Sequence, residues 1–135
     1  MATRSYIGVR NENEIIDYIY CHWDGYVDYN GKILIQHYTD MNKIKALMEL
    51  GDLSSLGKEI GEKHNFDAAK DSTFRGFREW CLAYGRDRGE KNEGIRTGDF
   101  RKLTSDRAVD YVYIFNGNSW ECFDTYSGES LKLYE

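Results

Sequence analysis

The chain has 135 residues, of which 41% are hydrophobic and 15% aromatic, and its formal net charge is −5. This composition excludes a disordered chain, which lacks the apolar area that offsets ordering entropy, and no run approaches the roughly 18 consecutive apolar residues of a membrane span. We therefore expect one domain over residues 1–135 that is cytoplasmic, has no secretory signal or membrane partner, and, being acidic, does not bind DNA directly.

The first predicted element is a β-hairpin. Residues 5–10 and 14–23 are rich in Ile, Val and Tyr, and the polar residues 11–13 between them tolerate a tight turn. Side chains alternate along a strand, so Ile16 and Ile19 fall on opposite faces of the second run, and both faces are mostly apolar. This pattern is typical of a central strand.

Helices are predicted next. The first begins near Asn30 and continues through residues 33–38, and the second follows the capping residue Asp40 with an apolar stripe at helical spacing. Gly51 then ends the second helix as a C-terminal cap. Residues 52–57 have the composition of a further short helical turn closed by a glycine.

The middle of the chain is less regular. Residues 58–78 lack a clear period and predict a polar loop or an irregular helix, whereas residues 80–84 are apolar enough for a buried strand. Residues 85–90 are expected to end that strand, residues 91–98 to form an exposed loop, and residues 99–103 to form a helical turn.

A three-stranded meander is predicted at the C-terminus. Residues 116–118 (Asn-Gly-Asn), between the β-type runs 110–115 and 119–126, are the strongest hairpin signal in the chain, and residues 131–134 continue the meander. The predicted fold class is therefore α+β, with a mostly antiparallel sheet of about five to six strands and two to three helices on one face. The strands come from the N-terminal hairpin, a middle strand and the C-terminal meander.

The densest group of reactive side chains consists of Cys21, His22, Trp23, Asp24, Tyr26 and His37. It lies where a predicted strand ends and a helix approaches, so that side chains converge there. A metal site would use the two histidines and the aspartate, with or without the cysteine. Alternation along a strand opposes use of Cys21 together with His22, and no HxxxH, HExxH or CxxC spacing supplies a preformed pair of ligands. The favoured interpretation is that Trp23 and Tyr26 are core anchors at a turn, and we expect no metal or other cofactor.

Three cysteines without a CxxC pair disfavour a disulfide framework and favour a reducing compartment. A cysteine nucleophile needs a histidine on another element, and Cys21 with His37 or Cys81 with His64 are the candidate pairs. Each of these two cysteines lies in an apolar run, where free cysteine behaves as a small buried hydrophobe. The sequence therefore does not favour cysteine catalysis.

The sequence Arg86-Asp87-Arg88 is a candidate phosphate-binding motif. It lies in the weakly basic part of the chain, since residues 61–107 carry 11 basic and 9 acidic side chains. Guanidinium groups suit phosphate oxygens and nearby tyrosine rings stack on bases, which allows an anion or nucleotide site. The alternative is that Asp87 pairs with its own neighbours in a solvated loop, and it is favoured because no P-loop or GxGxxG pattern is present.

The two ends of the chain are acidic. Residues 1–60 carry 6 basic and 9 acidic side chains, and residues 108–135 carry 1 basic and 5 acidic. Carboxylate pairs such as Asp24 with Asp28 are candidates for acid–base chemistry, but their spacing does not indicate a shared cleft. Tyrosine and tryptophan interleaved with aspartate and glutamate instead predict a surface that contacts a protein.

Five blocks of sequence occur in a specific order: residues 3–9 (TRSYIGV), 19–26 (IYCHWDGY), 31–38 (GKILIQHY), 50–57 (LGDLSSLG) and 83–90 (AYGRDRGE). In this order they resemble a family of small uncharacterised proteins encoded by phages, prophages and plasmids. The resemblance covers about half of the chain. Val27 departs from it, because the family usually has proline after the tyrosine of CHWDGY.

What the resemblance implies is biological context, because small acidic proteins carried by phages often inhibit host defence. The leading hypothesis is therefore a non-enzymatic accessory protein that binds and inhibits a host protein, such as a component of a CRISPR or restriction system. The alternative is a protein that binds or hydrolyses a nucleotide signal. That alternative would use Arg86 and Arg88 on phosphates, with His22, Asp24 and His37 as acid–base or metal residues.

Overall fold

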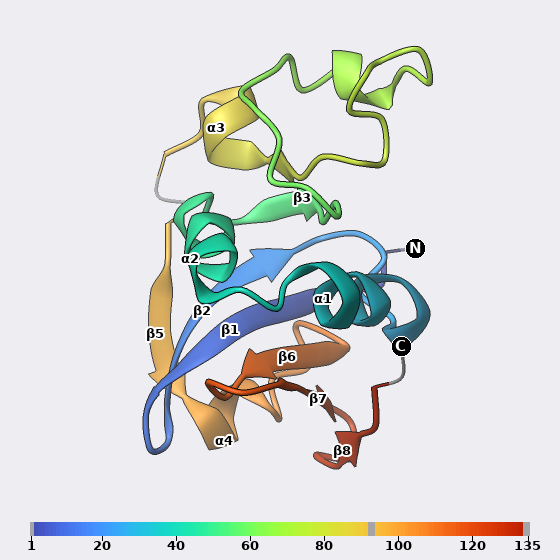
Figure 1. Cartoon of the computed structure of the whole chain (residues 1–135). Coiled ribbons are helices and arrows are strands. Elements are labelled where there is room, and N and C mark those ends of the chain that lie inside the picture. The colour runs from blue at the N-terminus through green and yellow to red at the C-terminus, as the bar shows by residue number, and fades with distance from the viewer. Residues whose placement is uncertain (1, 92–93, 134–135) are drawn as a thin grey trace.

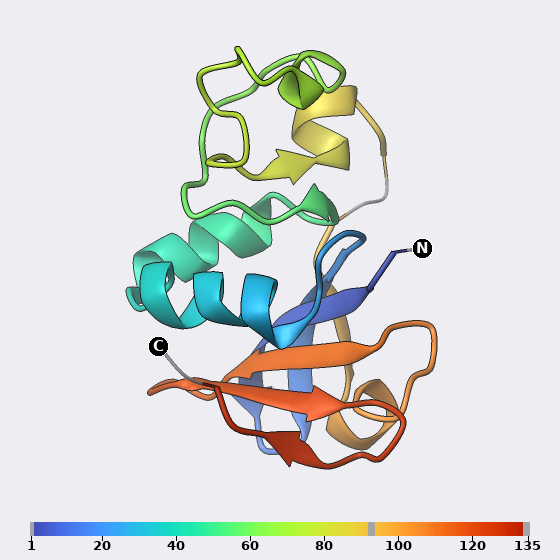
Figure 2. The same cartoon turned by 90° about the vertical axis from the view of Figure 1, so that its right-hand side faces the viewer.

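The computed structural model describes residues 2–91 and 94–133, and in it one mixed sheet is covered by helices (Figures 1 and 2). The strands are β1 (Ser5–Glu12), β2 (Ile15–Cys21), β3 (Leu53–Ser55), β4 (Leu82–Ala83), β5 (Arg96–Asp99), β6 (Tyr111–Phe115), β7 (Trp120–Asp124) and β8 (Ser130–Leu131). The helices are the π-helical η1 (Val27–Gly31), α1 (Lys32–His37), α2 (Met41–Glu49), the 3-10 turn η2 (Ala68–Lys70), α3 (Tyr84–Arg88) and α4 (Phe100–Leu103).

The strand order is β4-β3-β2-β1-β6-β7-β8, and β5 pairs with β2 off this path. The neighbours β1–β6 and β2–β3 are parallel, and the other pairs are antiparallel. The predicted α+β class, with a mostly antiparallel sheet, an N-terminal hairpin and a C-terminal meander, is therefore confirmed. The described residues form eight strands rather than five or six, because strands of two to four residues such as β4 and β5 leave no periodic pattern in a sequence.

The sheet has an apolar core on each face. Ile19 lies in the cluster that includes Leu34 of α1 and Leu47 of α2. Ile16 lies in the second cluster with Leu103 of α4. The predicted alternation of β2 is thus confirmed, but the helices do not all lie on one face: α1 and α2, with Val27 of η1, cover the first face, whereas α4 covers the opposite one (Figure 1).

Two local predictions are corrected. Residues 52–57 form no helical turn, because Leu53 pairs with Cys21 and makes β3 a parallel neighbour of β2. Within residues 91–98, predicted as a loop, Arg96 begins β5, which pairs antiparallel with β2; residues 92 and 93 lie outside the described part of the chain. The Arg96 guanidinium donates two hydrogen bonds to the Asp52 carboxylate, at 2.8 and 3.0 Å, which ties β5 to the start of β3.

Residues 56–81 form a long, largely irregular excursion, the 56–81 segment, which lies at the top of the molecule beside α3 (Figure 1). Its two ends are joined, since the Glu59 N–H donates to the Glu79 carbonyl at 2.9 Å and the Cys81 N–H donates to the Glu59 carbonyl at 3.0 Å. An ordered excursion of this length is uncommon in a compact domain and is usually functional. None of the helices in the described ranges is long and apolar enough to cross a membrane.

Candidate functional site

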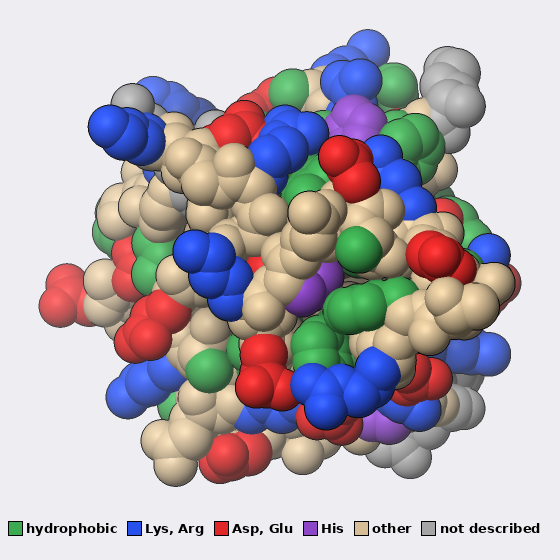
Figure 3. All heavy atoms as spheres, turned by 90° about the horizontal axis from the view of Figure 1, so that it is seen from above, with side chains coloured by type: hydrophobic (Ala, Val, Ile, Leu, Met, Phe, Trp, Pro, Cys, Tyr) green, Lys and Arg blue, Asp and Glu red, His purple; other side chains and the backbone are tan. Residues whose placement is uncertain are grey.

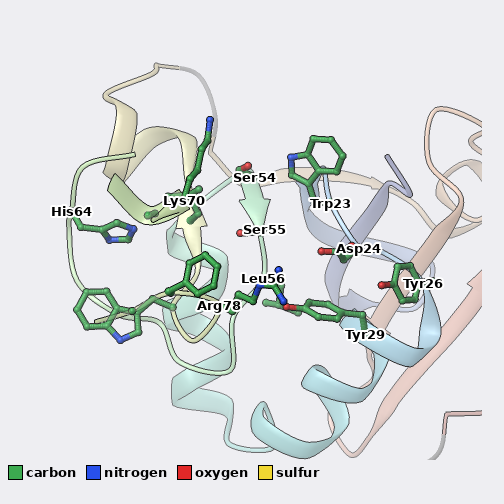
Figure 4. Close-up of a pocket in the computed structure, with 15 residues that line it drawn as sticks. Trp23, Asp24, Tyr26, Tyr29, Ser54, Ser55, Leu56, His64, Lys70 and Arg78 are labelled. Atoms are coloured by element: carbon green, nitrogen blue, oxygen red, sulfur yellow. The ribbon is translucent and has the colours of Figure 1, made fainter. Parts of the chain in front are cut away.

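A pocket of about 430 Å³ lies between the 56–81 segment and residues 22–29, which we call the aromatic corner (Figure 4). Ser54 and Ser55, at the end of β3, lie between these two walls. Seen from above, this end of the molecule has charged side chains of both signs, with hydrophobic side chains open between them (Figure 3). The pocket is therefore a hollow with both apolar and charged groups on its walls.

The aromatic corner holds Trp23 and Tyr26 in exposed positions, at 44% and 41% of their full accessible surface. The backbone around Trp23 is fixed, because its N–H donates to the Ser54 carbonyl at 3.0 Å and its carbonyl accepts from the Asn30 side chain at 3.3 Å. The Gly25 N–H donates to the Thr3 carbonyl at 2.8 Å. The two exposed rings therefore stand on a rigid turn, and neither is the core anchor that the sequence favoured.

The opposite wall is a packed aromatic cluster. His64 lies 4.9 Å from the Phe74 ring and 5.6 Å from the Trp80 ring, and the last two rings meet edge to face at 5.5 Å. Gly61 and Gly76 lie against the indole, where a Cβ at either position would come within 2.4–2.5 Å of Trp80. The glycines thus allow the 56–81 segment to close tightly around one tryptophan.

Two cations line the pocket from the 56–81 segment, Lys70 and Arg78. Lys70 has an exposed partner in Asp67 at 3.9 Å. Within the described ranges no carboxylate lies within ion-pair distance of Arg78, whose guanidinium stands over the Phe77 ring and extends toward Tyr29 in Figure 4. Arg78 is therefore a cation at the pocket without an anionic partner among the described residues.

One residue of the pocket wall has a strained backbone. Three non-glycine residues of the described chain have a left-handed backbone: Asn13 in the hairpin turn, Asp24 at φ 57° and Arg78 at φ 61°. Turn chemistry accounts for Asn13 and for Asp24, since both residue types tolerate this conformation, but it does not account for Arg78. A left-handed backbone costs a residue such as arginine on the order of 1–2 kcal/mol, so its occurrence at Arg78, on the wall of the pocket, marks the pocket as a functional candidate.

The structure separates the residues that the nucleotide hypothesis grouped. Among His22, Asp24, His37, Arg86 and Arg88, only Asp24 lines this pocket. The His22 ring shares a 2.7 Å hydrogen bond with the Tyr20 hydroxyl, and burial lowers the pKa of its imidazole, with a smaller contribution from Arg4. His37 is the last residue of α1, and Arg86 lines a different hollow beside Gly85.

The Arg86-Asp87-Arg88 motif forms internal contacts. The Arg86 guanidinium donates to the Asp87 carboxylate at 2.9 and 3.1 Å and to the carbonyls of Ile60 and Cys81. Arg88 stands over the Phe66 ring and pairs with Glu90. The Arg86 side chain thus fastens α3 to the 56–81 segment, and its hydrogen-bonding groups are directed at the protein's own oxygens.

The cysteines lie in the core. Cys21, Cys81 and Cys122 are free and buried, and burial raises the pKa of Cys21 and of Cys122 to about 12. The Cys81 thiol lies 3.3 Å from the Tyr38 hydroxyl rather than beside His64. Within residues 2–91 and 94–133 no three His, Cys, Asp or Glu side chains gather in a way that could hold a metal ion.

The sequence identified one wall of the pocket and missed the other. Trp23, Asp24 and Tyr26 were candidates, whereas Lys70 and Arg78 were not, although Arg78 lies in the basic part of the chain. Comparison of the chain with protein-family models, with curated proteins and with solved structures finds no match. The geometry of the pocket therefore carries the functional argument.

Proposed function

We propose that the protein is a non-enzymatic binding protein that captures a host component in the pocket between the aromatic corner and the 56–81 segment. The observation that carries this proposal is a preformed hollow with Trp23 exposed on a rigid wall and an unpaired Arg78 on the other. Small-molecule sites are concave, about 300–1,000 Å³ in volume, and combine aromatic walls with a few polar groups.

The titratable groups of the pocket favour binding of a ligand over its catalytic conversion. Asp24 is the one carboxylate among the described residues that line it. The His64 side chain is 8% exposed, lies against two aromatic rings, and its Nδ1 is 2.6 Å from the Glu62 carbonyl. General acid–base catalysis needs groups free to exchange protons with a substrate, and this histidine is already engaged.

The resemblance to proteins of phages and other mobile elements supports a biological setting. Capture of a host component by such a protein would counteract a bacterial defence system from within the host cytoplasm. The setting and the pocket are separate parts of the proposal, because the pocket's chemistry does not depend on where the gene is carried.

The proposed capture predicts that a ligand is retained unchanged. We expect the protein, after incubation with a filtered small-molecule extract of the host bacterium and washing, to release about one equivalent of a compound on heating. Arg78→Gly is expected to abolish retention, because it removes the guanidinium while suiting the left-handed backbone. Mass spectrometry of the extract before and after incubation measures both identity and amount.

Arg101→Gln is the matched control, since Arg101 is an exposed arginine of α4 that does not line the pocket. It is expected to retain the compound as the unaltered protein does. Equal amounts released from the Arg78→Gly protein would contradict the proposed site, and release of a chemically altered compound would contradict the non-enzymatic assignment.

A second candidate, inhibition of a host protein, is favoured by a neighbouring groove on the other side of Tyr26. It has a volume of about 240 Å³, and its lining consists of Thr3, Tyr26, Asp110, Tyr111, Asp124 and Tyr126. Tyr126 is 61% exposed, and within the described ranges no cation forms an ion pair with either aspartate. Exposed tyrosines beside carboxylates suit a basic surface, such as one that normally meets nucleic acid.

If the groove inhibits a protein of a host defence system, the chain is expected to protect an infecting phage. In bacterial strains that each carry one defence system, expression of the chain is expected to restore plaque formation in at least one strain. Asp110→Asn with Tyr126→Ala is expected to lose this effect, whereas Arg78→Gly keeps it. Loss of protection with Arg78→Gly, and not with the double variant, would instead show that protection depends on the pocket.

A further inference from the structure

The two ends of the pocket differ in chemistry. In Figure 4, Trp23 and Lys70 stand on opposite walls at one end, and Tyr29 and Arg78 face each other at the other end. The first end offers an exposed indole face, and the second offers a planar guanidinium. A ligand that fills the pocket therefore meets an aromatic surface at one end and a fixed positive charge at the other.

The aromatic end is suited to stacking. Trp23 stands on a turn that the Ser54 carbonyl and the Asn30 side chain hold in place, so its ring needs little ordering when a ligand binds. The His22 ring packs edge to face with the indole, with 4.7 Å between the ring centroids, and supports it from one side. Flat heteroaromatic rings stack on such a platform with little dependence on their identity.

The cationic end is suited to a phosphate group. A guanidinium presents paired N–H donors that match two phosphate oxygens, and Arg78 has no competing carboxylate within ion-pair distance among the described residues. Tyr29 lines the pocket beside it, and burial raises the pKa of this phenol, with Asp24 adding to the effect. The phenol therefore stays protonated and keeps an O–H donor next to the guanidinium.

We propose that the ligand of this pocket is a nucleotide, with its base stacked on Trp23 and its phosphate held by Arg78. This inference rests on the proposed capture function and names its ligand class. The Arg78 guanidinium is a permanent positive charge without a carboxylate partner among the described residues, so a phosphate ester is favoured over an uncharged nucleoside. A single nucleotide or a small cyclic one fits better than a nucleic-acid strand, because the chain is acidic overall and the pocket is enclosed by two walls.

The test uses the full chain and defined probes in isothermal titration calorimetry. The probes are the four 5′-nucleoside monophosphates, cyclic mono- and dinucleotides, the matching nucleosides, and inorganic phosphate. We expect at least one nucleotide to bind, with its nucleoside and inorganic phosphate each at least tenfold weaker. Affinity for the nucleotide is expected to fall as salt is raised, because the phosphate contact is electrostatic.

Three variants separate the two ends of the site. Arg78→Gly is expected to weaken the nucleotide at least tenfold and to leave the urea midpoint of unfolding unchanged or higher, since glycine relieves the left-handed backbone. Trp23→Ala is expected to weaken nucleotide and nucleoside by the same factor. The control Tyr126→Ala removes an aromatic ring that is even more exposed and lies outside the pocket, and it is expected to change neither.

The outcomes distinguish this inference from the proposed function. If a compound is retained from the bacterial extract while every nucleotide probe fails to bind, the ligand class is wrong and capture stands. If neither the extract nor any probe gives binding, both are wrong. Nucleotide binding that survives Arg78→Gly and Trp23→Ala would overturn the placement of base and phosphate.

Discussion

Replacement of Asp87 by asparagine is expected to lower the free energy of unfolding by about 3–5 kcal/mol, the usual effect of breaking a buried ion pair from one side. The Asp87 side chain is fully buried and accepts from the backbone N–H groups of Ala83, at 2.8 Å, and His64, at 3.2 Å. It also accepts two hydrogen bonds from Arg86. An amide has one oxygen and no charge, so the Arg86 guanidinium would be left largely buried without a counter-ion. Urea denaturation followed by tryptophan fluorescence measures the change.

The matched control is Glu90→Gln in the same region. Glu90 pairs with Arg88 at the surface, where both side chains are more than a third exposed, and exposed pairs contribute about 0–1 kcal/mol. We expect the two substitutions to differ by several-fold in their effect on stability. Equal urea midpoints would show that the Arg86–Asp87 contact does not hold α3 against the 56–81 segment.

These contacts show why the phosphate motif was ambiguous in the sequence. A guanidinium pair beside a carboxylate has the same appearance whether its donors meet a phosphate or the protein's own carbonyls. The acceptors of Arg86 are at Ile60 and Cys81, and the former lies 26 residues away in a stretch without periodicity. The number of satisfied donors is a property of the tertiary structure, and no local pattern encodes it.

The sequence predicted the parts of the fold that depend on contacts between residues close in the chain. The hairpins at residues 11–13 and 116–118 join neighbouring strands through local turn chemistry, and both were predicted. β3 was mistaken for a helical turn because its pairing with β2 joins Leu53 to Cys21, far apart in the chain. The parallel β1–β6 pair is likewise invisible to local patterns, although its strands were each identified.

The candidate site likewise has one wall that the sequence predicted and one that it did not. The aromatic corner was found because its reactive side chains are adjacent in sequence, so one short block displays them all. Lys70 and Arg78 belong to a segment whose packing is organised around Trp80 and three glycines rather than around a repeating period. The sequence showed a basic middle region, and only the fold places part of it opposite the corner.

Gly57→Ala is expected to destabilise the protein by about 1–3 kcal/mol and to weaken ligand capture at least tenfold, because it drives apart the two ends of the 56–81 segment. A Cβ at Gly57 would lie 2.4 Å from the Trp80 carbonyl carbon and 2.6 Å from the Glu79 carbonyl oxygen. Both are backbone atoms, and they are held by the paired hydrogen bonds of Glu59. This backbone cannot yield as a flexible side chain would, so Trp80 shifts and the pocket wall moves with it.

Gly94→Ala separates this steric effect from the general consequences of adding a methyl group. A Cβ at Gly94 meets nothing within 4 Å, and its backbone is outside the left-handed region, so the substitution is expected to change stability by no more than about 0.5 kcal/mol. Urea midpoints and retention of the extracted compound are measured for both proteins. If the Gly57 variant matches the Gly94 variant in both, close packing of Gly57 against Trp80 does not set the pocket wall. If stability falls while capture is unchanged, the packing is real but the pocket does not depend on it, which would exclude the 56–81 segment as one half of the binding site.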